Sequence, residues 1–455
     1  MNPELWNKIE AFDFDNPQNE YGFSIRLANE NFWTIAFTKN AILEYKKFMY
    51  LAATSDFMVS PSEVIDIVWH QHLIFTQLYE DFCTILGKKI QHIPSTHNKE
   101  EFKKFKDAKE RTQKFYEKDF GTQPRNIWIF NDIFESLLLE KANIKLRTFI
   151  IFGILAFVYL TIHSYYLLNP IYKLIDNPYF IIGLISITIL TFLGLENFNK
   201  SKLKKIISET DETSFLYDLH PFELMYLKTQ KLSIVINGVV NELIVAGTII
   251  INKDKTIEIA KSSSASNAIE QQVINTLTEL GKTFYPTLLR KLATKPILRN
   301  IPNSMDAFKK YFNKSKKFGT LFYVNFIVLT LLVLLSFTRI VTGIVAGKPI
   351  VQISIMTIIL VIVIVLFLIR LTKQISTTII PDIYSQKILT KTQIENNWQW
   401  KYFLFGTSVL ATSFVPLANY GNKKSENGGC GSSCGSSCGS SCGSSCSSCG
   451  GCGGD

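Results

Sequence analysis

Residues 349–369 read PIVQISIMTIILVIVIVLFLI, and this stretch decides the fold. It lies between Lys348 and Arg370, contains no Asp, Glu, Lys or Arg, and is mostly aliphatic. A helix of about 20 apolar residues is long enough to cross the hydrocarbon core of a bilayer. The stretch therefore predicts a membrane-spanning helix rather than a helix in the core of a soluble domain.

Three further windows have the same character and complete the predicted membrane region. The four spans form two pairs with short connections, which predicts two helical hairpins, and are expected at 148–168, 178–195, 318–338 and 349–369. A fifth apolar window lies between Lys401 and Lys423, with the possible span at 402–418, and contains Pro416 and several hydroxyl and amide side chains. Both a fifth span and an interfacial or re-entrant segment are consistent with that composition.

The charges predict how these spans are oriented. The chain of 455 residues has 48 Lys and Arg against 38 Asp and Glu, and 14 of the basic residues lie in four short windows on one side of the predicted spans. Because basic flanks mark the cytoplasmic side, residues 1–140 and 199–317 are predicted to be cytoplasmic domains. The bilayer and its anionic head groups are the expected partner of this charge. Nucleic acid is not expected, since residues 1–140 have 16 basic and 21 acidic side chains.

The N-terminal domain contains the element SPSEVIDIVWHQHLIFTQLYEDFCTILG at residues 60–87. Ser60 before a proline, Glu63 and the closing Gly87 are the start and stop signals of a helix, which we expect over residues 61–86. On its helical wheel His72 lies on the apolar face and His70 on the polar face, one turn after Asp66. His70 and His72 therefore cannot bind one metal ion together.

His72 is a candidate metal ligand or catalytic group, together with His92, His97 or Cys83. Imidazole and thiolate groups can bind zinc in such sets. The alternative is a buried His72 that is hydrogen-bonded and ties its helix to residues 90–97, IQHIPSTH. The sequence leaves both interpretations open.

The order of these motifs carries a resemblance. FSIRLANENFW, EYKKFMYLA, the WHxHL element and FKDAKERTQKFYEKDFGTQPRNIW follow one another between residues 23 and 128. The region resembles the N-terminal domain of an uncharacterised bacterial family of multi-pass membrane proteins, and its WHxHL part is similar to plant glycine-rich-domain proteins. That family reads closer to HHGPT where this chain has QHIPST, and it ends in Gly- or Cys-rich low complexity. The resemblance implies a bacterial cytoplasmic (inner) membrane protein with cytoplasmic soluble domains.

Residues 199–317 are expected to form the second domain. LSIVINGVVNELIVAG predicts a helix that ends at Gly247, and the apolar alternation around residues 252–255 predicts a β-hairpin, followed by a helix over 267–280. A helix pair followed by a hairpin is typical of a small winged-helix-like domain. Its charges balance over residues 214–261, which favours protein contact over DNA binding.

The tail, residues 421–455, is Gly/Ser/Cys low complexity and is expected to be disordered. Its thiolates are candidate ligands for zinc or another soft metal ion. Disulfide cross-linking, acylation or a tract without a ligand are the alternatives. The cysteines concerned are Cys430, Cys434, Cys438, Cys442, Cys446, Cys449 and Cys452.

The sequence thus predicts a mainly α integral membrane protein with an α-helical N-terminal domain, a small winged-helix-like domain, two transmembrane hairpins and a disordered tail. No phosphate-binding glycine loop or acyl-transfer triad is recognisable. An enzyme centred on the WHxHL domain is therefore the third of three functional hypotheses. The first is a membrane-anchored interaction or scaffold protein with a protein partner. The second is a metal- or thiol-handling membrane protein that uses the cysteine-rich tail.

Overall fold

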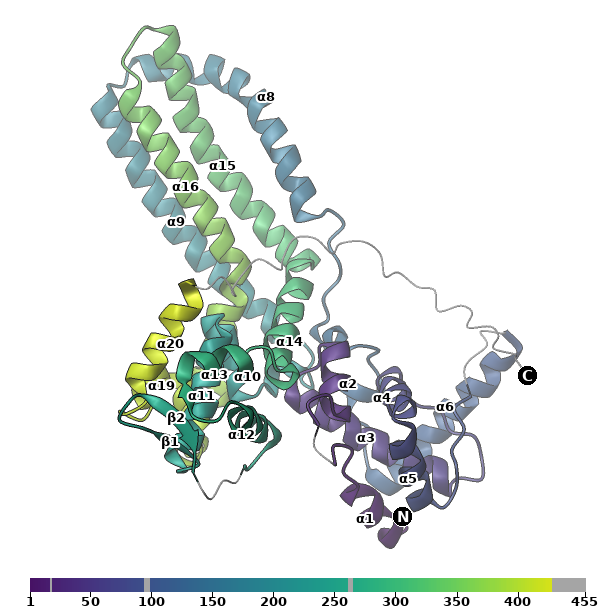
Figure 1. Ribbon diagram of the computed structural model, residues 1–455. Helices are drawn as coiled ribbons and strands as arrows, with labels where there is room; N and C mark the ends of the chain where they lie inside the picture. The colour runs from purple at the N-terminus through teal and green to yellow at the C-terminus, as the bar shows by residue number, and fades with distance from the viewer. Residues whose placement is uncertain (17–18, 94–98, 261–264, 428–455) are drawn as a thin grey trace, which may run out of the picture.

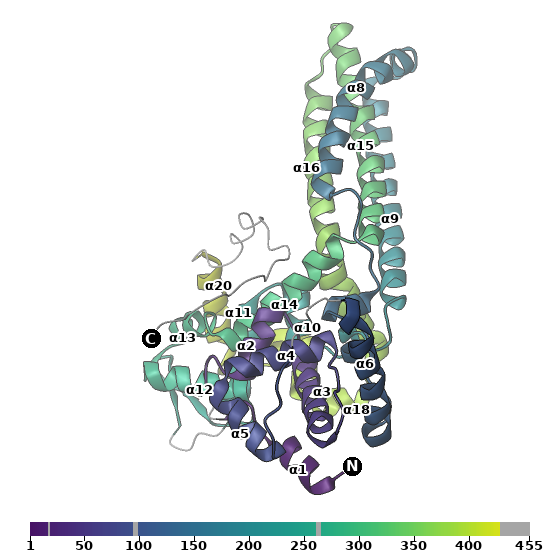
Figure 2. The same cartoon turned by 90° about the vertical axis from the view of Figure 1, so that its right-hand side faces the viewer.

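The computed structural model describes residues 1–16, 19–93, 99–260 and 265–427. They form a mainly helical protein whose described part has three short strands. Figure 1 shows a long bundle of four helices that rises from two soluble domains, and Figure 2 shows that both domains lie at the same end of the bundle.

The bundle consists of α8 (Leu146–Lys173), α9 (Asn177–Ser208), α15 (Lys316–Val345) and α16 (Val351–Gln374). All four helices are long and apolar enough to cross a membrane, α16 together with its continuation to Ile388. Because an α-helix rises about 1.5 Å per residue, each exceeds the roughly 30 Å of hydrocarbon in a bilayer. Three of the four windows predicted from the sequence lie inside these helices, and the fourth, 349–369, begins two residues before α16 and otherwise lies within it.

The loop between α8 and α9 is held by a side chain from α15. The guanidinium of Arg339 donates to the carbonyl of Tyr172, to the carbonyl of Ile175 at 2.6 Å and to Oδ1 of Asn177 at 3.0 Å. Carbonyls at a helix C-terminus lack partners within the helix, and a cation satisfies them well. Arg339 thereby joins the two hairpins at the end of the bundle away from the soluble domains.

Helix α16 does not end at the membrane region but continues into the second soluble domain. It runs on through two π-helical turns with a short α-helix between them, Ile375–Ile379, α17 (Ile380–Ile383) and Tyr384–Ile388. The Tyr384 hydroxyl donates to the carbonyl of Leu216 at 2.9 Å and accepts from the N–H of Leu219 at 2.7 Å. One uninterrupted helical rod therefore connects the bundle with this domain.

Residues 402–418 form no helix of membrane-spanning length. They lie in α19 (Trp398–Phe405), a 3₁₀ turn (Gly406–Val409) and α20 (Val415–Asn427), and both helices pack on the second soluble domain. The chain breaks at Gly406, whose φ of +63° suits glycine. Tyr402, Phe403 and Phe414 are buried in the domain core. The apolar side chains of this segment therefore pack in the second domain, and its short helices do not reach spanning length.

The N-terminal domain is all-helical, with α3 at its centre and α1, α2, α4, α5 and α6 packed around it. Trp33, Tyr45, Tyr50 and Phe48 are among the large side chains fully buried in this domain. Its elements are α1 (Pro3–Ala11), α2 (Phe23–Asn31), α3 (Ile35–Thr54), α4 (Glu63–Ile74), α5 (Thr76–Leu86), α6 (Lys99–Phe120), α7 (Arg125–Trp128) and the 3₁₀ turn Ile133–Leu137.

The prediction of one helix over residues 61–86 is wrong in two respects. The helix begins later, because the side chain of Ser62, not Ser60, caps it by accepting from the N–H of Ile65 at 3.3 Å. It also breaks at Phe75, which has φ −88° and ψ 69° and separates α4 from α5. The ring of Phe75 packs edge-on against Phe23. Tertiary packing of this kind overrides the continuous helical pattern of the sequence.

The second domain combines helices with a small antiparallel sheet. The predicted helix and hairpin form as expected, with Ile249 opposite Ile259, while a third strand beside the hairpin was not predicted. The winged-helix assignment stays a prediction. The elements are a 3₁₀ turn (Phe215–Tyr217), α10 (Pro221–Thr229), α11 (Leu232–Val245), β1 (Ile249–Ile251), β2 (Thr256–Ile259), α12 (Ala268–Leu280), β3 (Thr283–Phe284), α13 (Tyr285–Leu292), α14 (Pro296–Asn313) and α18 (Lys391–Asn396).

Helix α14 joins the two soluble domains, because it packs against α2 of the N-terminal domain and α10 of the second domain. Buried polar contacts reinforce this junction. Asn300 Nδ2 donates to the carbonyl of Trp33 at 3.0 Å, and Lys295 pairs with Glu20 at 2.8 Å. The second domain also includes the segment after α16, so it extends beyond the expected residues 199–317.

Candidate functional site at the interface of the two soluble domains

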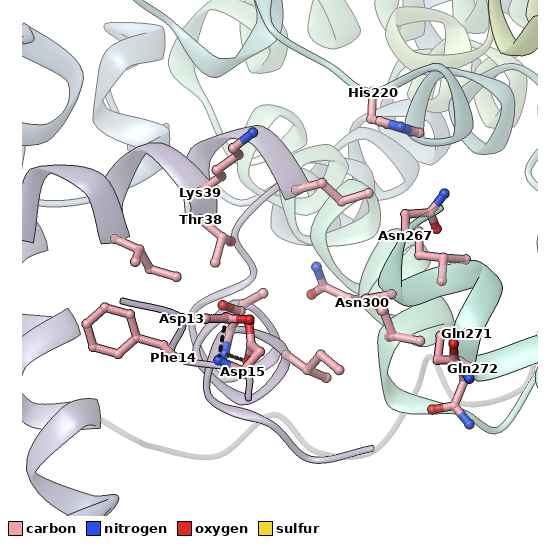
Figure 3. A pocket seen from close by; sticks show the side chains of 18 of the residues that line it. Asp13, Phe14, Asp15, Thr38, Lys39, His220, Asn267, Gln271, Gln272 and Asn300 are labelled. Atoms are coloured by element: carbon pink, nitrogen blue, oxygen red, sulfur yellow. Dashed lines mark hydrogen bonds between the residues drawn. The ribbon is translucent and has the colours of Figure 1, made fainter. Parts of the chain in front are cut away.

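A cavity of about 780 Å³ lies between the two soluble domains (Figure 3). Its N-terminal wall comes from α1, α2, α3 and the loop between α1 and α2. The opposite wall comes from the start of α10 and from α12, α14 and α19. A cavity of this size at a domain interface is a common place for a ligand or a peptide segment.

Apolar groups supply most of the lining surface, and amides are the commonest kind of polar side chain in it. Figure 3 shows Asn300 of α14 between Thr38 and Lys39 of α3 and Asn267 of α12. The apolar side chains are Phe12, Phe14, Ile25, Ala28, Ile35, Ile42, Leu43, Phe222, Ile269 and Ile297. The amides are Asn19, Asn40, Asn267, Gln271, Gln272, Asn275, Asn300 and Gln399.

Asn300 has an unused hydrogen-bonding atom inside this cavity wall. The residue is only 5% exposed, and its Oδ1 has no hydrogen-bond partner in the described part of the chain. A buried polar atom without a partner costs about 1–3 kcal/mol. That cost is set against the hydrogen bond that Nδ2 of the same side chain donates to the carbonyl of Trp33.

The N-terminal wall is acidic. Glu10, Asp13, Asp15 and Glu20 line it, against two lysines, Lys39 and Lys46. The ammonium of Lys46 is turned to the backbone, where it donates to the carbonyl of Glu10 at 2.7 Å and to that of Phe12. Burial also lowers the pKa of Lys46. The excess of carboxylates suits a ligand with basic groups.

The Asp13–Asp15 loop is shaped by its own carboxylates. Asp13 Oδ1 accepts from the N–H of Asp15 at 2.9 Å, and Asp15 Oδ1 accepts from the N–H of Ser24 at 2.9 Å. Side chains of Asp commonly stabilise turns in this way. The loop therefore presents an ordered acidic edge to the cleft (Figure 3).

His220 and Glu223 at the start of α10 lie where the domains meet. Burial lowers the pKa of His220 to about 4, and its Nδ1 accepts from the N–H of Phe222 at 3.2 Å. Glu223 is fully buried and accepts from the N–H of Ile35 at 2.9 Å and from that of His220 at 2.8 Å. Burial raises the pKa of Glu223 to about 7, although both N–H groups favour its ionised form.

His72 lies in the core of the N-terminal domain and not in the cleft. Its Nδ1 is 2.8 Å from the Tyr45 hydroxyl, and the rings of Phe14, Tyr79 and Phe82 surround it. Burial lowers its pKa to about 4. His72 is thus buried and hydrogen-bonded as in the structural interpretation, but its partner is Tyr45 of α3 and not residues 90–97. No group of three ligand-type side chains in the described residues includes His72. Its role as a metal ligand stays a prediction.

The structure brings His92 to Asp66 and His70. Asp66 Oδ1 is 2.8 Å from His92 Nε2, and Asp66 Oδ2 is 3.2 Å from His70 Nδ1. The pairing of His70 with Asp66 follows from the helical spacing, whereas the arrival of His92 from a loop could not be seen in the sequence. His97 and the seven tail cysteines, Cys430 to Cys452, lie outside the described residues.

Glu223 at the junction of the domains and Asn300 in the cleft were not singled out from the sequence. Glu223 is 188 positions from Ile35, and Asn300 is 267 positions from Trp33. The only local signal was the His-Pro-Phe-Glu start of α10, in which Glu223 completes a capping box with His220.

Comparison with known proteins adds one match. Residues 33–125 match the profile of the uncharacterised UCP032817-like family. The matched range includes α3 to α6 and the Asp66–His70–His92 group. No curated protein and no solved structure matches the chain. The predicted similarity of the WHxHL element to plant glycine-rich-domain proteins stays a prediction.

Proposed function

We propose that this protein is a membrane-anchored interaction or scaffold protein that holds a protein segment in the cleft between its soluble domains. The observation that carries the proposal is the cavity of about 780 Å³ that both domains line. Two domains joined by buried polar contacts form a preorganised receptor, which lowers the entropic cost of binding.

The lining determines what kind of segment fits. Its apolar floor favours aliphatic or aromatic side chains, and the carboxylates of Glu10, Asp13 and Asp15 favour Lys or Arg beside them. The proposed occupant is therefore a peptide segment that combines basic and apolar residues.

We further propose that the bundle lies in a bacterial cytoplasmic membrane and that both soluble domains face the cytoplasm. The basic residues beside the spans support this orientation. The bacterial assignment rests on the resemblance of residues 23–128 to a multi-pass membrane family. In the same proposal, α10 to α13 serve as a winged-helix-like unit for protein contact.

Site-specific photo-crosslinking in intact cells tests the proposed function. A photoreactive residue replaces Lys39 or Asn275, which line the cleft, and replaces the exposed Lys106 on α6 as the matched control. We expect a discrete protein adduct from the two cleft positions and none from the control. Mass spectrometry of the adduct identifies the bound segment.

A second variant shows whether the adduct comes from the cleft. Ala268 is exposed at the edge of the cavity, so Ala268→Trp fills space without disturbing a core. We expect this change to remove the adduct, whereas Ala346→Trp, in the loop between α15 and α16, leaves it intact. Cleft positions that give no discrete adduct would contradict the proposal.

A further inference from the structure

A second cluster of chemically capable side chains lies apart from the cleft, on the N-terminal domain. Asp66 and His70 come from successive turns of α4, and His92 comes from the segment after α5. One ligand atom from each residue can be chosen so that all three lie within 4.8 Å of one another. Two imidazoles and a carboxylate are a common donor set for zinc and other divalent transition metals.

The distances are close to those that one metal ion requires. The two oxygens of Asp66 are 2.8 Å from His92 Nε2 and 3.2 Å from His70 Nδ1, and the imidazole centroids are 4.4 Å apart. Metal–nitrogen and metal–oxygen bonds of about 2.0–2.2 Å in a tetrahedron place neighbouring ligand atoms about 3.3 Å apart. Small side-chain rotations would bring all three donors to one centre.

The fold positions all three ligand residues. The i, i+4 spacing puts Asp66 and His70 on the same face of α4. The ring of Trp69 packs edge-on against His92 at 4.6 Å, and the Tyr79 hydroxyl donates to the carbonyl of Ile90, which anchors the segment that carries His92. The side chain of His92 is only 15% exposed. Binding would therefore require little ordering of the chain.

The remaining side of the cluster is open to solvent. The side chain of His70 is 56% exposed and that of Asp66 is 29% exposed. Three protein ligands with one accessible position are the arrangement of a zinc site that keeps a water molecule. A closed structural site would have four protein ligands instead.

We propose that Asp66, His70 and His92 bind one divalent transition-metal ion, zinc in the cell, with water as a further ligand. This site differs from the His72 set and from the cysteines of the tail. It is also independent of the proposed function of the cleft, so either proposal can fail without the other.

Cobalt(II) titration of the full-length protein in detergent tests the site, with visible absorbance as the readout and zinc as the competitor. The seven tail cysteines are replaced by serine, because thiolates would bind the same ions. We expect one equivalent of Co²⁺ with an absorbance spectrum of nitrogen and oxygen ligands, displaced by Zn²⁺. Asp66→Asn, His70→Ala and His92→Ala should each weaken binding at least tenfold.

His163→Ala is the matched control, because it removes an exposed histidine from α8 and should leave the titration unchanged. If His92→Ala fails to fold, His70→Ala decides, since the exposed His70 contributes little to the core. Co²⁺ binding that is absent from the protein without tail cysteines, or unchanged in His70→Ala and Asp66→Asn, would overturn the proposal. Asp66 would then only hydrogen-bond two imidazoles.

Discussion

Glu223 on α10 accepts a hydrogen bond from the backbone N–H of Ile35 at 2.9 Å, and this bond joins the second soluble domain to the first residue of α3. The carboxyl group is completely buried. Its other oxygen accepts from the N–H of His220, so one side chain fixes the start of two helices. The junction that forms the cleft therefore depends on a titratable group.

This carboxyl group should make the junction sensitive to pH. Its pKa is raised by burial from 4.5 to about 7, so the folded state binds the proton more tightly than the unfolded state. The resulting stabilisation is fully present below pH 4.5 and is lost as the pH rises to about 7. The loss is about 3 kcal/mol at most. Thermal unfolding of the purified protein at pH 5 to 8 should show it.

Glu223→Gln is expected to flatten this pH dependence. The change also removes one acceptor oxygen and leaves an N–H unpaired, at a cost of about 1–3 kcal/mol. The variant should thus be less stable than the wild type at pH 5, with a smaller difference at pH 8. Burial raises the pKa of Glu242 to about 7 as well, so Glu242→Gln measures how much Glu242 contributes to the pH dependence of stability. If the slope of stability against pH is unchanged in Glu223→Gln, Glu223 is not the source of this pH dependence.

His72 should give the opposite response on the acidic side. Burial lowers its pKa from 6.5 to about 4, so the unfolded state binds the proton first. Its contribution is fully present above pH 6.5 and is lost as the pH falls to about 4. We expect His72→Leu to reduce the slope of stability against pH in this range, and His163→Leu to leave it unchanged. An identical slope in both variants would refute this role.

Asn300 is expected to contribute to the docking of the two domains. Asn300→Ala removes the hydrogen bond to the carbonyl of Trp33, which is then buried without a partner. The variant also removes the unpartnered Oδ1, so we expect local loosening of the junction with little change in global stability. Asn303→Ala is the matched control on the same helix, because Asn303 is only half-buried and its bond to Asn29 is long, at 3.4 Å. Hydrogen exchange at α2 and α3 should increase in the first variant only.

Arg339 should be essential for the far end of the bundle. Arg339→Lys keeps the charge but loses the planar fork that reaches Tyr172, Ile175 and Asn177 together. We expect a loss of stability in detergent of about 2–4 kcal/mol, since hydrogen bonds to charged groups contribute about 1.5–3 kcal/mol each. The exposed Lys348 provides the control Lys348→Arg. Equal unfolding temperatures in both variants would argue against this role.

The sequence predicted those features whose signal is local. Uncharged windows identify the four long helices, alternation around residues 252–255 identifies the hairpin, and helical spacing pairs His70 with Asp66. Each of these patterns depends on neighbours within one element. The break at Phe75 was missed, because it depends on packing against Phe23 rather than on a glycine or proline.

The sites were harder to predict than the helices. The cleft needs residues from both domains, and His92 reaches Asp66 by way of a loop. Residues 402–418 were ambiguous for the same reason, since their apolar side chains are explained only by the domain on which they pack. Contacts between distant segments leave no periodic trace in a single sequence.

The uninterrupted rod formed by α16 and its π-helical continuation has a mechanical consequence. Near the C-terminal end of this rod, the Tyr384 hydroxyl hydrogen-bonds to the carbonyl of Leu216 and the N–H of Leu219, directly before α10. A continuous helix couples the orientation of the bundle to that of the second domain more closely than a flexible linker would. A change in bilayer thickness that tilts α16 would therefore also shift α10. The first turn of α10 contacts the N-terminal domain.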